Sequence, residues 1–457
     1  MAIECDLLIA GAGAAGLAAA ARATELGAKV VLIEKTGAIG GATQYSASFV
    51  TFAGTEHQKQ LGYPDTNEIL YEDLVRSSNG TGDPELLNAY VGKQLEVYRW
   101  LVDRGVVFKD VVHFPYQTWP RAHHTEPLPM LQKLLRHAEA NGKLRVLYDC
   151  AATRPLVENG RVVGLKVQLN GRPEEIRAGR GVVLATGGFG WGEDFVSTFV
   201  PNALKGVRFG HRANTGDGLR ICMSLGADMR DMGFVKGTFA SHPVVGPERH
   251  EMVHAYYDGA ICVNKLAKRF MDESLSYKLN VDYALLQPDH IGYQILDAKV
   301  FAKGLPGVST NDYEDYHRRG KMTRHETLED VAAAYDLDPA ELRRTVETYN
   351  SDIATFGYDR VWGRAHAVTG SGEVTPVDTP PYYVFPTVQV FASTFAGTRI
   401  DGRTRVLNVF GEPVEGLHAV GEMTGGFHGH GYMTGTSVGK SLVFGYIAAE
   451  TLAEANQ

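Results

Sequence analysis

The chain has 457 residues, of which 44% are hydrophobic, and a formal net charge of −8 at pH 7. This length exceeds that of one ordinary domain, and the apolar fraction suffices for large cores, so we expect two domains. The modest negative charge and the lack of a basic run argue against nucleic acid as a partner.

The N-terminal segment has the pattern of a dinucleotide-binding unit. An apolar run at residues 5–10 predicts a buried parallel strand, and the glycines Gly11, Gly13 and Gly16 follow it. An Ala- and Leu-rich helix comes next, and then a second strand that ends in Glu34. In such units the glycines admit a pyrophosphate to the turn, and the acid about twenty residues later accepts a hydrogen bond from a ribose.

Three later segments favour FAD over NAD as the bound dinucleotide. A glycine-rich segment at 40–46 lies where the chain would turn back under the flavin diphosphate. Residues 181–188 predict another buried strand that ends in a glycine turn, and residues 416–422 predict a strand followed by an acid. Residues 439–445 begin the last helix, whose N-terminal amides can face the anionic side of a reduced flavin ring. We expect FAD contacts from Gly11, Gly13, Ala15, Gly16, Glu34, Lys35, Gly41, Ala42, Thr43, Ser46, Ala185, Thr186, Gly187, Asp217, Gly421, Glu422, Ser437, Ser441 and Leu442.

Between these segments the sequence predicts an antiparallel layer. Residues 144–186 form predicted strands that are interrupted by Asn-Gly pairs at Asn159 and Asn170, which are strong hairpin signals. Residues 214–218 then open a helix, with Asp217 as its expected N-cap.

The pattern changes after residue 236. Residues 261–263 predict a short strand, and two well-marked helices follow. The first begins at Thr327, and the second is capped by Asp338 with Pro339 at its first position.

These signals predict an α/β fold with two domains. Residues 1–236 and 373–457 form a Rossmann-like FAD-binding domain, with a parallel sheet plus a small antiparallel layer. Residues 237–372 form an inserted α+β domain, which a glycine-containing loop at 370–372 joins back to the first. On these segments the chain resembles the fumarate reductase and succinate dehydrogenase flavoprotein superfamily over most of its length. The resemblance implies that the inserted domain is a substrate cap.

The resemblance also locates two informative substitutions. Soluble fumarate reductases carry a GKRFxNE-like stretch before a proton-donating arginine; here residues 267–273 read AKRFMDE, and Tyr277 holds the arginine position. A second family arginine follows a TGGxHG segment; here residues 424–429 match, and Tyr432 takes that position. Two phenols in place of two permanent cations do not suit a dicarboxylate, so we do not expect fumarate reduction.

The replacements resemble those of ketosteroid and cyclic-ketone dehydrogenases in the same superfamily. That likeness implies that Tyr432 and Gly435 donate to a ketone oxygen, although their spacing is one residue shorter than in the steroid enzymes. Tyr277 then takes the α-proton, and Tyr116 is a candidate supporting phenol by its location alone. The expected activity is FAD-dependent desaturation of a cyclic ketone to an enone, by α-proton abstraction and β-hydride transfer to flavin N5.

Several alternatives stay open. The substrate is either a steroid or a compact cyclohexanone. The cyclohexanone is favoured because this chain is shorter than the steroid dehydrogenases that it resembles. A reductase of a conjugated acid or enone is the runner-up, and a flavin-binding sensor without turnover is a third reading. Any single tyrosine is also a candidate packing residue, since the chain contains 21.

Two histidines suggest a carboxylated ketone such as 4-oxocyclohexanecarboxylate. His242 matches a family histidine that touches a substrate carboxylate, and His428 belongs to the TGGxHG segment; either can instead be a wall residue. His428 and His430 lack a nearby carboxylate or thiolate, so no metal is expected. Arg121 with its following histidines is expected in a solvated loop, and Lys440 is expected to be structural.

Composition limits the remaining partners. No stretch of eighteen apolar residues occurs and the first strand starts at residue 5, so we expect a soluble, cytoplasmic protein without a signal peptide. The four cysteines are far apart, which argues against an iron–sulfur cluster or an attached haem and favours an external electron acceptor. No histidine occurs in residues 40–48, where membrane-bound relatives attach flavin, so FAD is expected to bind noncovalently.

Overall fold

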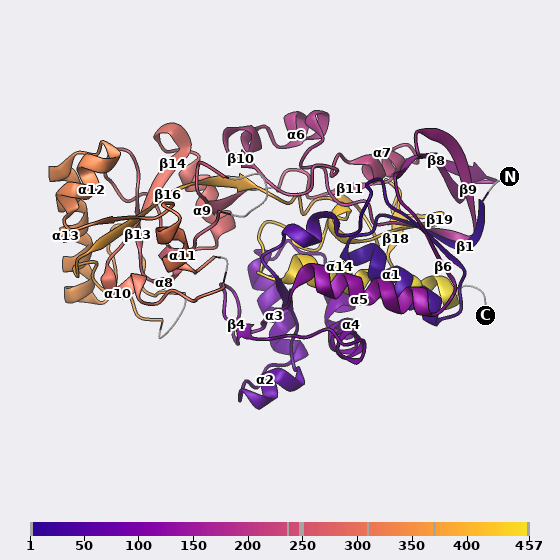
Figure 1. Ribbon diagram of the computed structural model, residues 1–457, viewed down its shortest axis with the longest axis horizontal. Helices are drawn as coiled ribbons and strands as arrows, with labels where there is room; N and C mark the ends of the chain where they lie inside the picture. Colours follow the sequence, from indigo (N-terminus) through magenta and orange to yellow (C-terminus); the bar gives the residue numbers. More distant parts are fainter. Residues whose placement is uncertain (1–2, 235–236, 246–250, 309, 369–371, 455–457) are drawn as a thin grey trace. The chain divides into compact units, whose positions relative to one another are not determined.

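The computed structural model describes residues 3–234, 237–245, 251–308, 310–368 and 372–454. The chain forms two compact units (Figure 1). The first consists of Met1–Val200, Gly210–Val235 and Ser393–Gln457, and the second of Pro201–Phe209 and Lys236–Ala392.

The first unit is built on a sheet whose main path has the strand order β18-β19-β9-β1-β2-β6. These strands are β1 (Ile3–Ala10), β2 (Val30–Ile33), β6 (Leu144–Leu147), β9 (Arg172–Leu184), β18 (Arg405–Leu407) and β19 (Pro413–Ala419). Strand β1 pairs in parallel with β2 and β9, and β9 pairs in parallel with β19. The predicted strands around residues 5–10 and 181–184 are nearly uniformly apolar because both faces of such a sheet are covered.

Helices pack together beside this sheet, and a hairpin layer extends it. Helix α1 (Ala14–Glu25) contacts α5 (Pro127–Ala140) and α14 (Thr436–Glu454) (Figure 1). Strand β7 (Cys150–Glu158) pairs antiparallel with β8 (Arg161–Leu169), and β8 with β9, through turns at the two Asn-Gly pairs. The predicted α/β class, parallel sheet and antiparallel layer are therefore confirmed.

The other elements of the first unit are short apart from two helices. They are η1 (Gly41–Tyr45), β3 (Phe49–Thr51), α2 (Glu56–Gln60), α3 (Asn67–Ser77), α4 (Pro84–Asp103), β4 (Val111–Val112), β5 (Ala122–His124), α6 (Glu193–Phe199), α7 (Asp217–Met223), β11 (Met229–Arg230), β17 (Gly397–Thr398) and η4 (Gly421–Met423).

The second unit surrounds one long strand, β16 (Tyr382–Phe391). Strands β10, β12, β14 and β15 all pair with β16, and β13 pairs with β14. The remaining elements are η2 (Pro201–Lys205), β10 (Val207–Arg208), β12 (Thr238–Ser241), α8 (Ala255–Asp258), β13 (Ile261–Val263), α9 (Tyr277–Ala284), η3 (Pro288–His290), β14 (Ile291–Leu296), α10 (Ala298–Phe301), α11 (Tyr313–Arg318), β15 (Thr323–His325), α12 (Leu328–Tyr335) and α13 (Pro339–Phe356).

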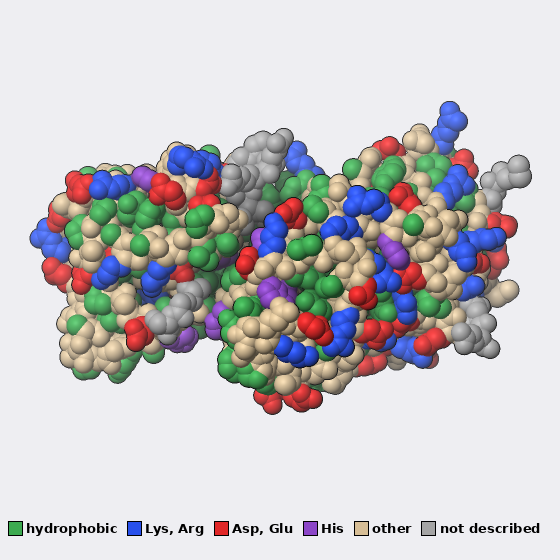
Figure 2. Space-filling model, turned by 60° about the horizontal axis from the view of Figure 1, so that its bottom comes forward, with side chains coloured by type: hydrophobic (Ala, Val, Ile, Leu, Met, Phe, Trp, Pro, Cys, Tyr) green, Lys and Arg blue, Asp and Glu red, His purple; other side chains and the backbone are tan. Residues whose placement is uncertain are grey.

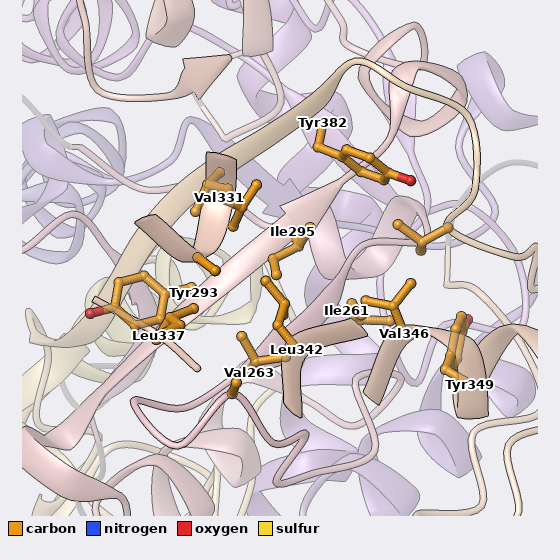
Figure 3. Close-up of a cluster of buried hydrophobic side chains, with 14 of the residues drawn as sticks. Ile261, Val263, Tyr293, Ile295, Val331, Leu337, Leu342, Val346, Tyr349 and Tyr382 are labelled. Atoms are coloured by element: carbon orange, nitrogen blue, oxygen red, sulfur yellow. The ribbon is translucent and has the colours of Figure 1, made fainter. Parts of the chain in front are cut away.

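A buried apolar cluster holds the second unit together. Figure 3 shows Ile261 and Ile295 from the sheet facing Leu342 and Val346 from α13. The two helices begin as predicted: Thr327 and Asp330 form a reciprocal cap on α12, and the carboxylate of Asp338 accepts from two amides of α13. Short-range capping rules were sufficient to locate both helices.

The second unit runs on to Ala392, past the predicted boundary at residue 372. Strand β16 causes the difference, because it pairs with β14 from Tyr383 to Val388 and cannot separate from it. Strand β10 joins the same unit by pairing with Val390 and Phe391. The predicted boundary at residue 236 and residues 370–371 of the return loop lie outside the described residues. The cap role of this unit stays a prediction.

Two local expectations were wrong. Asp217 does not cap α7, whose N-cap is Gly216 without a side-chain hydrogen bond; the Asp217 carboxylate instead binds Lys35 Nζ at 2.7 Å. Helix α14 begins at Thr436 rather than Gly439. Glycine is needed at position 439 inside this helix because a Cβ there would lie 2.5 Å from the Tyr90 hydroxyl oxygen.

In the part of the chain that the structure describes, no helix is both long and apolar enough to cross a membrane. Acidic and basic side chains are interspersed over the face shown in Figure 2. Among the same described residues, no group of three or more His, Cys, Asp or Glu side chains is arranged to hold a metal ion.

Candidate active site

The turn between β1 and α1 is glycine-rich for two different physical reasons. A Cβ at Gly11, whose φ is +110°, would lie 2.3 Å from the carbonyl oxygen of Ala185, and one at Gly16 would lie 1.8 Å from the oxygen of Gly11. Gly11 therefore lets the segment after β9 approach the turn, and Gly16 lets helix α1 approach the end of β1. A Cβ at Gly13 would meet no protein atom nearer than 3.7 Å. Protein packing therefore does not require Gly13, and its bare backbone fits the close approach of a pyrophosphate.

Side chains from later segments hold this turn in place. The hydroxyl of Thr43, in η1, accepts from the amide of Ala14 at 3.1 Å, at the start of α1. The Glu34 carboxylate accepts from the amides of Ala12 and Thr36, both at 2.9 Å. Glu34 thus orders the turn directly, and its predicted contact with a ribose stays a prediction.

A second cluster of predicted FAD residues forms where β9 ends. The Glu422 carboxylate accepts from the amide of Thr394 at 2.9 Å and from Asn214 Nδ2 at 3.2 Å. Burial raises the pKa of Glu422. Gly187 has a φ of +74°, and a Cβ there would lie 2.7 Å from Asn214 Oδ1. A Cβ at Gly421 would lie 3.0 Å from the Cβ of Ala15. The structure therefore brings the ends of β9 and β19 to the start of α1.

Other predicted FAD contacts occupy the same unit. Lys35 donates to Thr215 Oγ1 at 2.8 Å as well as to Asp217. The rest are placed as follows: Gly41 and Ala42 in η1, Ser46 just after it, Ala185 and Thr186 after β9, and Ser437, Ser441 and Leu442 in α14. Together these residues form a nucleotide cradle that fits FAD, and the contact of each one with the cofactor is a prediction.

Tyr432 and Gly435 lie side by side at the beginning of α14. The amide of Gly435 donates to the Tyr432 hydroxyl oxygen at 3.3 Å. Burial raises the pKa of Tyr432 to about 12, while the amides of Gly435 and Ser437 act in the opposite direction. The phenol is therefore protonated at neutral pH and can donate. A Cβ at Gly435, whose φ is +92°, would lie 2.6 Å from Thr51 Oγ1, so the turn requires glycine.

The loop that carries Tyr116 is tied to the same turn. The carbonyl of Thr434 accepts from Thr51 Oγ1 at 2.7 Å and from Gln117 Nε2 at 3.4 Å. Tyr116 itself is half-buried and has a φ of +68°, a strained value for a bulky side chain. Arg76 Nη2 donates to the Tyr116 carbonyl at 3.0 Å, which holds this backbone. Burial raises the pKa of the Tyr116 phenol.

Arg121 is not in a solvated loop, as the sequence suggested, but is fully buried. Its Nη2 lies 2.9 Å from Asp65 Oδ1 and 2.8 Å from Asp73 Oδ2. Asp73 also accepts from the Thr118 amide at 2.6 Å, two residues after Tyr116. The prediction failed because the two acids are distant from Arg121 in sequence, and because β5, which follows Arg121, pairs with both β3 and β4.

His428 packs against Tyr432 in an aromatic group. Phe395 stacks on Tyr432, with ring centroids 4.7 Å apart and planes at 23°, and its ring meets His428 edge-on at 4.7 Å. The His428 and Tyr432 centroids are 5.3 Å apart. The structure therefore unites His428, Tyr432 and Gly435 in the first unit, as their shared segment suggested. Phe395 was missed, since nothing in its local sequence marks it.

Tyr277 belongs to the second unit, where it is the first residue of α9. Its amide donates to the hydroxyl of Tyr257 at 2.7 Å, and that hydroxyl donates to the Leu275 carbonyl at 3.1 Å. The Tyr277 ring stacks on buried His254, with centroids 4.9 Å apart and planes at 23°. Burial lowers the pKa of His254 to about 3, so this imidazole is neutral. No pattern in the sequence marked His254 and Tyr257, which lie about twenty residues before Tyr277.

The AKRFMDE motif contributes a buried ion-pair network to this part of the second unit. Arg269 Nη2 and Glu273 Oε2 form a buried ion pair at 2.5 Å. Arg364, also buried, lies 3.6 Å from Glu273 and donates to the carbonyls of Tyr256 at 2.7 Å and Ala260 at 2.9 Å. This network fixes the segment that bears His254 and Tyr257.

His242 is the other predicted site residue in the second unit. Its Nδ1 accepts from the Val244 amide at 3.0 Å, and its ring meets Phe385 edge-on at 5.4 Å. Burial lowers its pKa. Local contacts of this kind fit a wall residue as well as a ligand-binding one.

Comparisons with known proteins agree with the cradle. A family model described as FAD binding domain matches residues 6–438. The NADH:fumarate oxidoreductase of Klebsiella pneumoniae is 27% identical over 98% of this chain, which spans 48% of that protein. The 4-oxocyclohexanecarboxylate 2-dehydrogenase of Sinomonas cyclohexanicum is 26% identical, with 98% of this chain and 92% of that protein covered. Among solved structures, the 3-ketosteroid Δ4-(5α)-dehydrogenase of Rhodococcus jostii RHA1, in complex with 4-androstene-3,17-dione, has a TM-score of 0.81 and 26% identity, with 99% of this chain and 97% of that chain covered.

Proposed function

The chain belongs to the FAD binding domain family of flavin-dependent oxidoreductases, and from that premise we propose that it desaturates a cyclic ketone to the conjugated enone. FAD is its cofactor, and the glycine cradle around Gly13 would hold the diphosphate. When bound, FAD supplies the hydride acceptor for the hydrogen that leaves the β-carbon. We propose that it binds noncovalently.

The observation that carries this proposal is the adjacency of two donors at Tyr432 and Gly435. The hydroxyl and amide atoms are 3.3 Å apart at the beginning of a helix, where amide N–H groups give a positive local potential. In this structure the Gly435 amide donates to the phenol oxygen, so a ketone oxygen bound there would accept from the Tyr432 hydroxyl and take over the Gly435 N–H. Such preorganised donors stabilise a developing enolate by about 3 kcal/mol each. The raised pKa of Tyr432 suits a donor and not a base.

Tyr277 is proposed as the group that takes the α-proton. It is buried, and its backbone is fixed by Tyr257 while its ring is fixed by His254. It acts as the phenolate, which takes the α-proton and becomes the neutral phenol, and a rigidly held side chain loses little freedom when a substrate binds, which favours efficient proton transfer. Tyr116 is proposed as a supporting phenol, since its loop is tied through Gln117 to the turn before Gly435.

For the substrate we propose a compact cyclohexanone, with or without a carboxylate. The Sinomonas relative acts, by its name, on 4-oxocyclohexanecarboxylate, and this chain covers 92% of it. His428 is proposed to contact the substrate from its place beside Tyr432, and His242 from the second unit. The reoxidising partner is proposed to be an external electron acceptor, because the four cysteines are too far apart to bind a cluster.

Two other readings have observations in their favour. A reductase acting on a conjugated acid or enone is supported by the likeness to an NADH:fumarate oxidoreductase, of which this chain spans about half. A steroid dehydrogenase is supported by the likeness to the Rhodococcus structure, which contains a steroid dione. Like the proposed reaction, both change the bond between the α- and β-carbons beside a carbonyl group. The identity of the substrate therefore distinguishes the three functions.

The proposal is tested by mixing FAD-loaded protein with ketones without oxygen. Cyclohexanone, 4-oxocyclohexanecarboxylate and a 3-ketosteroid are each added, and the visible flavin absorbance is followed. Bleaching by a cyclohexanone supports the proposal, and bleaching by the steroid alone assigns the second reading. Recolouring of prereduced protein by fumarate, with no bleaching by any ketone, would reject desaturation as the function.

A further inference from the structure

A cavity in the first unit is lined by arginines and has no role in the proposed reaction. Its volume is about 330 Å³, which is in the range of small-molecule sites. Four arginine residues line it, from β8, β9, the turn before β18, and β18 itself: Arg161, Arg180, Arg403 and Arg405. The lining also contains apolar residues, among them Val414, Leu417 and Leu452, and the polar residues Glu415, His418 and Thr451.

This arginine pocket lies at the opposite ends of the strands from the nucleotide cradle. Strands β9 and β19 are parallel, with Leu417 beside Val182 and Ala419 beside Leu184. The pocket residues Arg180 and 413–416 precede these pairs, whereas the cradle residues near Gly187 and Gly421 follow them. The pocket is therefore not part of the FAD site.

Close backbone contacts build the pocket walls. Arg161 Nη2 donates to the carbonyl of Arg180 at 2.6 Å, which holds the Arg161 guanidinium beside strand β9. Gly416 has a φ of +76°, and a Cβ there would lie 2.3 Å from the Val162 oxygen. A Cβ at Gly181 would lie 2.9 Å from Leu452. The two glycines let three separate segments converge on one cavity.

The four arginines differ in their distance to the nearest acidic side chain. Arg403 and Arg405 have partners at hydrogen-bond distance, Glu454 at 2.8 Å and Asp401 at 2.7 Å. Arg161 and Arg180 have longer contacts, 3.6 Å to Glu415 and 4.0 Å to Asp6.

Of these acids, Glu415 is the one that lines the pocket, and its side chain is 68% exposed. A solvated carboxylate at 3.6 Å gives little stabilisation, so a stronger anion can replace it.

We propose that the arginine pocket binds a small oxyanion with two or more negative charges, either a phosphate compound or a polycarboxylate. Guanidinium forks match both groups in two-pronged hydrogen bonds. Arg161 and Arg180 supply the main contacts, and Glu415 competes with the ligand for Arg161. The apolar lining contacts the organic part of a ligand that has one.

Binding is measured by calorimetry on FAD-loaded protein in low-salt buffer, with pyrophosphate in one series and citrate in another. The stronger of the two identifies the class of oxyanion. The double variant Arg161→Gln, Arg180→Gln is expected to weaken binding by about tenfold or more, since charge-assisted hydrogen bonds are lost. The control Arg172→Gln, an exposed β9 residue outside the pocket lining, should change nothing.

Glu415→Gln gives a test of opposite sign that does not depend on the double variant folding well. Removing the competing carboxylate should tighten binding several-fold. No binding of either anion to the wild-type protein, or unchanged or weaker binding in Glu415→Gln, would overturn the proposal. Equal losses in the Arg172 control would do the same. None of these readouts involves turnover, so they are independent of the ketone reaction.

Discussion

Lys440 gives a prediction whose sign and size both follow from its surroundings. It lies in the second turn of α14 with 2% of its surface exposed, and its Nζ donates to the Thr424 carbonyl at 2.8 Å. Burial lowers its pKa from the ordinary 10.5 to about 8, even though Asp231 and Glu422 act in the opposite direction. A cation near a helix N-terminus is also unfavourable. The charged lysine therefore destabilises the folded protein.

The pH dependence follows from the two pKa values. Below pH 8 both the folded and the unfolded chain carry the charge, so the whole cost is present. Between pH 8 and pH 10.5 the unfolded chain binds more protons, so stability rises with pH and the cost disappears. The pKa difference corresponds to about 3 kcal/mol.

Replacing Lys440 by Met removes this cost and also the hydrogen bond to Thr424, which is worth about 1 kcal/mol. We therefore expect Lys440→Met to raise the free energy of unfolding at pH 7 by about 2 kcal/mol, and to lose that advantage as the pH approaches 10.5. Urea denaturation of the FAD-loaded protein at pH 7 and pH 9.5 measures the difference, with exposed Lys29→Met as the control. A variant that is less stable than wild type at pH 7, or an advantage independent of pH, would refute the reasoning.

Two further predictions concern the cradle and the buried ion triad. Gly16→Val should abolish FAD retention in gel filtration, because even a Cβ would lie 1.8 Å from a backbone oxygen, whereas Gly92→Ala, with open space around it, should retain FAD fully. Arg121→Met should lower the free energy of unfolding by about 3 to 5 kcal/mol in urea, because Asp65 and Asp73 would be left without their buried cation; a variant as stable as wild type would show that the triad adds nothing.

Features set by short-range chemistry could be predicted from the sequence. The glycines from Gly11 to Gly16 have a fixed spacing within one strand–turn–helix unit, so they are recognisable at once, even though Gly11 also makes room for the distant Ala185. The caps at Thr327 and Asp338 depend on residues three positions away or fewer. The placement of Tyr432 beside Gly435 likewise results from a tight turn.

Features that depend on distant partners could not be predicted. Arg121 is buried only because Asp65 and Asp73, from two earlier segments, meet it. The second unit extends past residue 372 because β16 completes a sheet whose other strands come much earlier in the chain. His254 gains its place beside Tyr277 through folding of the second unit, and no local pattern indicates it.

The central claim is that the phenol of Tyr432 donates to a ketone oxygen. It is tested most directly by the anaerobic bleaching rate of Tyr432→Phe with the best cyclic ketone. The matched control is Tyr446→Phe on the same helix, whose hydroxyl binds Glu96 instead. We predict that Tyr432→Phe keeps its FAD but bleaches about a hundredfold more slowly, the cost of one lost oxyanion donor, while Tyr446→Phe bleaches at the wild-type rate. Wild-type bleaching by Tyr432→Phe would contradict the account.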